Sequence, residues 1–188
     1  MSPTWWIVIG LVVVVIGALV WLYNRLVRLR LRADDGWATI DVQLRRRYDL
    51  IPNLVETVQG YAAHEREVFE RVTEARTRAI EAGGTRDQAS AEDAVTAGLG
   101  KLMAVVEAYP ELKADQHFLA LQEELVGTES KIAYARQFYN DQVRLLNTAI
   151  DSFPSNLIAR TFDFEKRSFF DIEDPVAEPV QVDLGRNE

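Results

Sequence analysis

The sequence contains no cysteine and only two histidines among its 188 residues. The absence of cysteine excludes disulfides, thiolate nucleophiles and cysteine-based zinc sites, and it suits a reducing compartment. His64 and His117 lie in neither a Glu-x-x-His nor a His-Glu-x-x-His pattern, which are the spacings of di-iron and zinc sites on helices. No glycine-rich phosphate loop ending in Lys-Ser or Lys-Thr is present. We therefore predict that the protein is not an enzyme and uses no metal or other cofactor.

Positive charge is scarce and unevenly distributed. The whole chain has a formal net charge of −8. Residues 1–47 hold seven arginines and three aspartates, a net of +4, so residues 48–188 carry −12. Because nucleic-acid binding needs a basic face on the folded domain, the acidic body argues against nucleic acid as a partner. The basic N-terminal part instead suits an anionic surface such as lipid headgroups.

One long apolar run, residues 5–23, contains no charge and no proline. As a helix it would span about 28 Å, close to the hydrocarbon thickness of a bilayer. Trp5 and Trp6 at one end and Trp21 and Tyr23 at the other match the aromatic belts of a spanning helix. A buried core helix rarely stays apolar on every face for this long. We therefore predict a transmembrane helix, with the lipid bilayer as its partner.

A cleaved signal peptide is the alternative to an anchor. Residues 1–4 contain no Lys or Arg, the apolar run is longer than a typical signal core, and no small-x-small cleavage site follows it. The arginines lie after the run, and an excess of Lys and Arg marks the cytoplasmic flank. We expect a single-pass protein of the cell membrane, with residues 1–4 as a short extracytoplasmic N-terminus and the remainder cytoplasmic.

Residues 24–47 form the next predicted segment, a basic helical neck that continues the anchor. Gly36 is its weak point, since glycine costs about 1 kcal/mol relative to alanine within a helix. The sequence leaves open whether the neck is straight or kinked there. Pro52, a little further on, marks either a bend or a new helix beginning near Ile51.

Residues 48–161 carry apolar side chains at alternating spacings of four and three, which is the pattern of amphipathic helices. Gly83-Gly84, Pro110 and Pro154 predict helix ends, and Ser90 with Asp93 and Asp115 predict helix starts. No segment of useful length alternates with period two. The prediction is therefore an all-α fold, in which the transmembrane helix is followed by a long antiparallel bundle of three to four helices with coiled-coil-like packing. Residues 162–188 are predicted to form a tail, first Phe-rich and docked, then acidic and partly flexible.

Two sets of polar side chains are candidates for function. An arginine cluster suits acidic protein surfaces or lipid phosphates, although a solvated helix face is the alternative. If the helix is straight, its distal part lies about 33 Å beyond Tyr23 and therefore faces solvent or a protein. The candidate partner or lipid contacts are Arg25, Arg28, Arg30, Arg32, Arg45, Arg46, Arg47, Asp49 and Asn53. The second set, predicted to act structurally by hydrogen bonding, is Asn140, Asn147 and Asn156.

The stretches WATIDVQLRRRYDLIPNLVETVQGYAAHE, LMAVVEAYPELKADQHFLALQEELVGTESKIAYARQFYND and NTAIDSFPSNLIA resemble the LemA family of bacterial membrane proteins. They cover most of residues 37–159, in order. The resemblance implies one N-terminal transmembrane helix and a long cytoplasmic helical bundle. It implies no catalytic residues. Because some members of the family are encoded near membrane proteases, it also raises an association with quality control.

Three functions remain open from the sequence. The first is a non-catalytic scaffold that forms a homo-oligomer, with Gly10 and Gly17 as a small-residue strip where two anchors could approach. The second is an adaptor or regulator of a membrane enzyme such as a quality-control protease. The third, which the acidic body and the two histidines support least, is a small-molecule sensor or enzyme.

Overall fold

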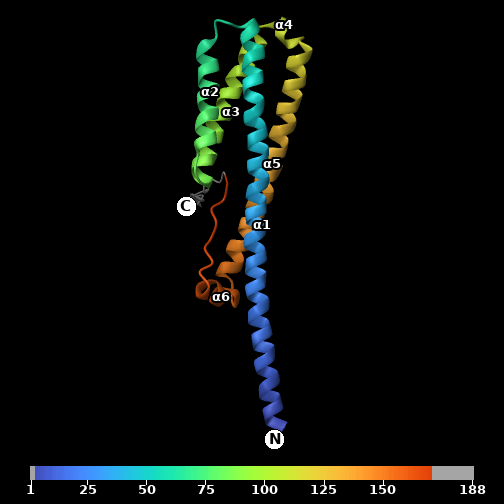
Figure 1. Ribbon diagram of the computed structural model, residues 1–188, viewed down its shortest axis with the longest axis vertical. Helices are drawn as coiled ribbons and strands as arrows, with labels where there is room; N and C mark the ends of the chain where they lie inside the picture. The colour runs from blue at the N-terminus through green and yellow to red at the C-terminus, as the bar shows by residue number, and fades with distance from the viewer. Residues whose placement is uncertain (1–2, 171–188) are drawn as a thin grey trace, which may run out of the picture.

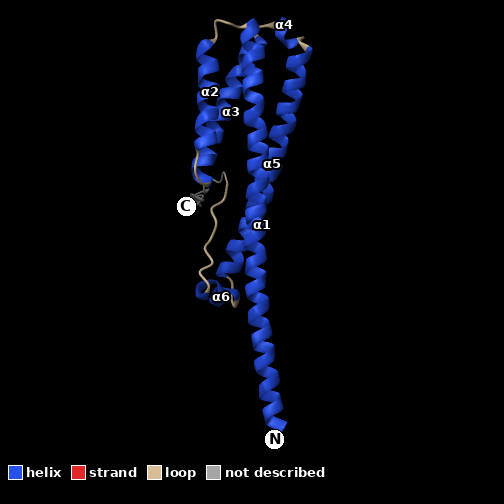
Figure 2. Ribbon diagram, in the orientation of Figure 1, coloured by secondary structure: helices blue, strands red, loops and turns tan. Residues whose placement is uncertain are grey.

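The computed structural model describes residues 3–170, and every regular element within that range is helical (Figure 2). The predicted all-α class is thus confirmed. The helices are α1 (Pro3–Tyr61), α2 (Arg66–Glu81), α3 (Thr85–Glu107), α4 (Pro110–Lys113), α5 (Gln116–Asp151) and α6 (Ser155–Thr161).

α1 has 59 residues and runs the whole height of the molecule (Figure 1). At 1.5 Å per residue it is about 88 Å long. Its N-terminal part projects alone, and its apolar side chains there are exposed. The helix continues through Gly36 without a break. This residue lies against the backbone of α5. A Cβ on Gly36 would stand 3.2 Å from the Cα of Tyr139. Glycine is used here for close helix packing.

α1 also passes through Pro52 without ending, so of the two alternatives at this proline a new helix beginning near Ile51 is excluded. Proline has no N–H to donate to the carbonyl four residues earlier, which belongs to Tyr48. The guanidinium Nε of Arg76, on α2, donates to this carbonyl at 2.7 Å instead. A neighbouring helix therefore supplies the hydrogen bond that proline removes. The chain turns later, at residues 62–65, where no helix end was predicted.

The predicted end of a helix at Gly83-Gly84 matches the turn between α2 and α3, where Gly84 has a φ of +85°. The predicted start at Ser90 is wrong, since α3 begins at Thr85 and Ser90 is an exposed residue inside it. The start of α5 is as predicted. The backbone N–H of Phe118 donates to the Asp115 carboxylate at 2.8 Å, which lowers the pKa of that carboxyl.

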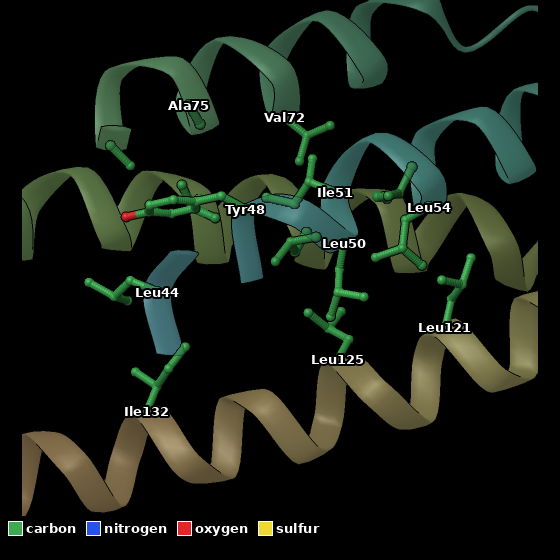
Figure 3. Close-up of a cluster of buried hydrophobic side chains, with 14 of the residues drawn as sticks. Leu44, Tyr48, Leu50, Ile51, Leu54, Val72, Ala75, Leu121, Leu125 and Ile132 are labelled. Carbon is green, nitrogen blue, oxygen red and sulfur yellow. The ribbon is translucent and has the colours of Figure 1, made fainter. Parts of the chain in front are cut away.

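Above the projecting part of α1, the helices run up, down, up and down in the order α1, α2, α3 and α5 (Figure 1). α1 packs mainly along α5, and α2 along α3. Figure 3 shows apolar side chains of α1, α2 and α5 meeting between the helices. The buried centre of α1 includes Leu44, Ile51, Leu54 and Val58. The neck and the first helix of the bundle are thus one continuous helix, and the neck contributes side chains to the core of the bundle.

Below the four-helix part, α5 continues beside α1 and leads into α6 (Figure 1). The chain then turns back and runs upward as an extended segment, Phe164–Phe170, which we call the strap. Phe164 and Phe170 are buried at its two ends. The Phe-rich part of the tail is therefore docked from Phe164 to Phe170, whereas Phe162 is exposed. The acidic part expected to be flexible lies outside the described residues.

Candidate functional site

The arginines nearest the apolar run are exposed on α1. These are Arg25, Arg28, Arg30 and Arg32. The Arg25 guanidinium lies 5.7 Å from the ring centroid of Trp21, and that of Arg30 lies 5.3 Å from the ring of Phe164. Aromatic rings therefore orient two of these cations while leaving them accessible.

Arg45, Arg46 and Arg47 have three different environments, although they are consecutive. Arg45 pairs with Asp41 at 3.0 Å on the same helix, and Arg46 reaches Glu124 of α5 at 2.8 Å. Both of these arginines are exposed. Arg47 is completely buried. Successive helix residues point about 100° apart, so one member of a triplet can face the core while its neighbours face solvent.

Arg47 corrects the expectation that the whole triplet is offered to lipid or a partner. Its guanidinium contacts Glu92 of α3, which is also fully buried, and donates to Glu129 of α5 at 2.9 Å. The Thr96 hydroxyl lies 3.4 Å from the same nitrogen. The charge of Arg47 is thus matched inside the bundle, and this side chain holds three helices together.

Neighbouring polar side chains extend this pair into a network. The Tyr48 hydroxyl and the Gln88 amide both donate to Glu92, the latter at 2.8 Å. Gln88 also donates to the Ala79 carbonyl at 3.1 Å. Burial raises the pKa of Tyr48, so its hydroxyl stays protonated and can donate. We call Arg47, Tyr48, Gln88, Glu92 and Glu129 the buried polar network.

Gln88 and Glu92 are not among the predicted site residues, although the sequence contains a signal for their burial. Glu92 lies three residues before Val95 and seven before Leu99, in register with the apolar stripe of α3. Gln88 lies one turn earlier on the same face. A charged residue on the apolar face of a helix needs a buried partner of opposite charge. That partner is Arg47, one of the three consecutive arginines. The closed geometry suits a structural role, fixing the register of the helices.

A groove of about 590 Å³ borders this network, between α1 and the turn that joins α2 to α3. It is lined by Trp37, Asp41, Arg45, Asp49 and Tyr48 among others. Two aspartates and one arginine on its wall make the groove polar, and the groove is open to solvent. Within residues 3–170, no group of three or more His, Asp or Glu side chains could hold a metal ion.

Asn53 is exposed on α1, one turn beyond Asp49, which is exposed as well. Neither side chain contributes to the buried polar network. Together with Arg45 and Arg46 they form the exposed remainder of the predicted cluster. We call these four residues the outer arginine face.

Two of the three candidate asparagines hold the strap against α5. The Asn147 side chain donates to the Arg167 carbonyl at 2.9 Å and accepts from its N–H at 3.0 Å. Asn140 makes the same pair of bonds with Phe170, both at 2.8 Å. Seven helical residues rise about 10.5 Å, and three extended residues span about 10 Å. The two spacings match, so both amides pair with the backbone of one straight strap.

Side-chain contacts add to this hold on the strap. The Tyr139 hydroxyl donates to the Ser168 carbonyl at 2.9 Å, and Arg167 pairs with Asp34 of α1 at 2.9 Å. The buried Phe170 ring lies 5.7 Å from Trp37. The strap therefore links α1 to α5. Asn156 is half-buried on α6, and its side-chain oxygen has no hydrogen-bond partner among the described residues.

Comparison with known proteins finds a match to the LemA family over residues 36–184. Magnetosome proteins MamQ 1 and MamQ 2 of Paramagnetospirillum magneticum are each 27% identical over 185 residues, covering 85% of this chain and 68% of theirs. MamQ of Magnetospirillum gryphiswaldense is 26% identical over 174 residues, covering 79% of this chain and 64% of its own. Protein LemA of Metamycoplasma hominis is 24% identical over 164 residues, covering 85% and 73%. The family match spans the distal half of the neck, the bundle and the strap, and the chain therefore belongs to the LemA family.

Proposed function

We propose that this protein is a non-catalytic scaffold, anchored in the cell membrane by α1, that self-associates through its helical surfaces at the cytoplasmic face. The exposed apolar part of α1 supports the anchor, since it is long enough and apolar enough to cross a bilayer. The arginines that follow it support a cytoplasmic body and an extracytoplasmic N-terminus.

The observation that carries self-association is a set of five large apolar side chains exposed on one side of α5, with polar side chains such as Glu123 and Gln137 between them. The five fall within an arc of about 120° at 100° per residue. They are Leu119, Val126, Tyr134, Phe138 and Leu145. Exposed apolar patches that follow one element are typical of interaction surfaces. We call this set the α5 stripe.

A second copy of the chain is the occupant that this geometry favours. α1 runs unbroken from the apolar part into the bundle, so every copy in one bilayer holds its body at the same height. The α5 stripe of one copy then meets that of another in register, about an axis along the membrane normal. Gly10 and Gly17 leave open space on α1, where two anchors can approach.

The proposal is tested by the mass of the full chain in a mild detergent, from light scattering coupled to size exclusion. We expect a uniform oligomer, which Val126→Glu on the α5 stripe shifts toward monomer. Val42→Glu is the matched control, because Val42 on α1 is equally exposed, at 60%, and lies outside the stripe. A monomeric wild type, or equal effects of the two substitutions, would refute self-association through α5.

An adaptor or regulator of a membrane enzyme such as a protease is the second candidate. The outer arginine face favours it, because it lies beside the polar groove and remains exposed. Affinity purification of Arg45→Glu/Arg46→Glu from detergent should then lose partners that the wild type retains. Arg47 must be left intact in this experiment, since it is buried. Unchanged recovery of partners would refute a role of the outer arginine face in partner binding.

A further inference from the structure

α6 and the turn before it lie beside α1 at the level where its apolar run ends. A small core joins them there, formed by Leu22, Leu26, Ala149, Ile158, Ala159 and Phe164. The Tyr23 ring meets Phe162 edge to face at 4.9 Å and Phe164 at 5.8 Å. Tyr23 is the last residue of the apolar run. The lower end of the body is therefore fixed at the height of the expected membrane surface.

Three large apolar side chains are exposed at this end. They are Phe153 in the turn before α6, Leu157 on α6 and Phe162 directly after it, which are 80%, 55% and 56% exposed. We call these three residues the tip. The Tyr23 ring covers one edge of Phe162, and the rest of the tip is open, although the core beside it is packed.

The tip also overlaps the apolar run along the axis of α1. A groove of about 450 Å³ separates the turn before α6 from α1, and its lining joins Phe153 and Pro154 to Ala18 and Trp21. Ala18 lies about 7.5 Å before Tyr23 along the helix. When the apolar run spans a bilayer, the groove and Phe153 are carried into the interfacial layer of that bilayer.

We propose that the tip is a second membrane-contact site, which inserts into the phospholipid interface of the bilayer that α1 crosses. This inference rests on the proposed anchor. Aromatic and apolar side chains are favoured at this depth. Charged side chains of both signs flank the tip: Arg25 and Arg144 line the groove and Arg160 is exposed on α6, while Asp151 and Asp163 are exposed beside Phe153 and Phe162. The apolar side chains therefore carry the contact, and the arginines are placed to meet lipid phosphates.

The contact has a structural consequence for the body. α1 alone would leave the body able to tilt and rotate about a single helix. Insertion of the tip provides a second point of attachment on one side of α1, so it sets the rotation of the bundle relative to the membrane. α5 leads directly into the tip, and its outward face is therefore held at a fixed angle to the membrane plane.

The absence of cysteine allows a direct test in the full chain. Single variants Phe153→Cys and Leu157→Cys are labelled with NBD and reconstituted into vesicles of phosphatidylcholine and phosphatidylglycerol. Lipids with a nitroxide near the headgroup then quench any label in the interface. Val13→Cys, within the apolar run, reports on the anchor. Val42→Cys, an exposed apolar position of the bundle that lies outside the α5 stripe, is the matched control for the tip.

We expect both tip labels to emit at shorter wavelength than the label at Val42, and to be quenched at least twofold more strongly. Quenching at the level of Val42, with the Val13 label still in the bilayer, would overturn the tip and leave the anchor standing. A blue-shifted tip label that the nitroxide lipids do not quench would show a protein partner there and also overturn the proposal. A Val13 label outside the bilayer would overturn the anchor itself.

Discussion

Replacing Arg47 with methionine should destabilise the bundle far more than the same change at Arg46. Arg47 and its partner Glu92 are both fully buried, so Arg47→Met leaves a carboxylate inside the bundle without its cation. Breaking a buried pair in this way costs about 3–5 kcal/mol. Arg46 is also paired with an acid on α5, but both partners are about half-exposed, and such pairs contribute about 0.2–1 kcal/mol.

The assay is thermal unfolding of the full chain in detergent, followed by circular dichroism. For a body of this size, 1 kcal/mol corresponds to about 2–4 °C in Tm, so Arg47→Met should lower Tm by roughly 6–20 °C. Arg46→Met should lower it by no more than about 4 °C.

The double variant Arg47→Met/Glu92→Leu completes a double-mutant cycle. Removing both charges leaves Tyr48 and Gln88 hydrogen bonded to each other at 2.9 Å. We therefore expect the double variant to be more stable than the sum of the single effects implies, by about 2–3 kcal/mol. Equal losses at Arg46 and Arg47, or strict additivity in the cycle, would refute the argument that the pair is coupled through burial.

Three further outcomes follow from the packing. Gly36→Ala should lower Tm, because a Cβ there meets the α5 backbone and such overpacking costs about 1–3 kcal/mol. Gly100→Ala has open space around it and should raise the free energy of unfolding by up to about 1 kcal/mol. Asn147→Ala should release the strap, lower the free energy of unfolding by about 1–3 kcal/mol and speed tryptic cleavage within the strap. The control Asn53→Ala, at an exposed position, should change the free energy of unfolding by no more than about 0.5 kcal/mol. Burial raises the pKa of Tyr48, so the folded state holds the phenolic proton more tightly than the unfolded state. Stability should therefore fall as pH rises above about 10. The decrease in Tm between pH 8 and pH 10.5 should be smaller for Tyr48→Phe than for the wild type.

Several features of the fold could be read from local sequence because local chemistry decides them. Asp115 caps α5 through a hydrogen bond to a residue three positions away, and Gly84 adopts a positive φ that glycine tolerates. The alternating four-and-three spacing of apolar residues also marks the buried face of α5, which includes Phe118, Ile132 and Leu146. Such features need no knowledge of distant segments.

Other features depended on partners far away in the chain. Pro52 predicts a break by its own chemistry, but Arg76 satisfies the carbonyl that it leaves, and α1 continues. Ser90 resembles a helix cap, but the face that carries Gln88 and Glu92 is buried, and the helix extends back to Thr85. In both cases tertiary contacts outweighed a local signal worth only about 1–3 kcal/mol.

The sequence by itself determined the apolar run, the charge asymmetry, the all-α class and the membership of the LemA family. Composition and helical periodicity carry the first three of these properties, and motifs spread along residues 36–184 carry the family membership. Only the tertiary structure decided that Arg47 is buried while Arg46 is exposed, that Asn140 and Asn147 hold the strap, and that the tip lies level with Tyr23. Those properties depend on which helix faces meet, and burial then changes what a charge or an amide requires.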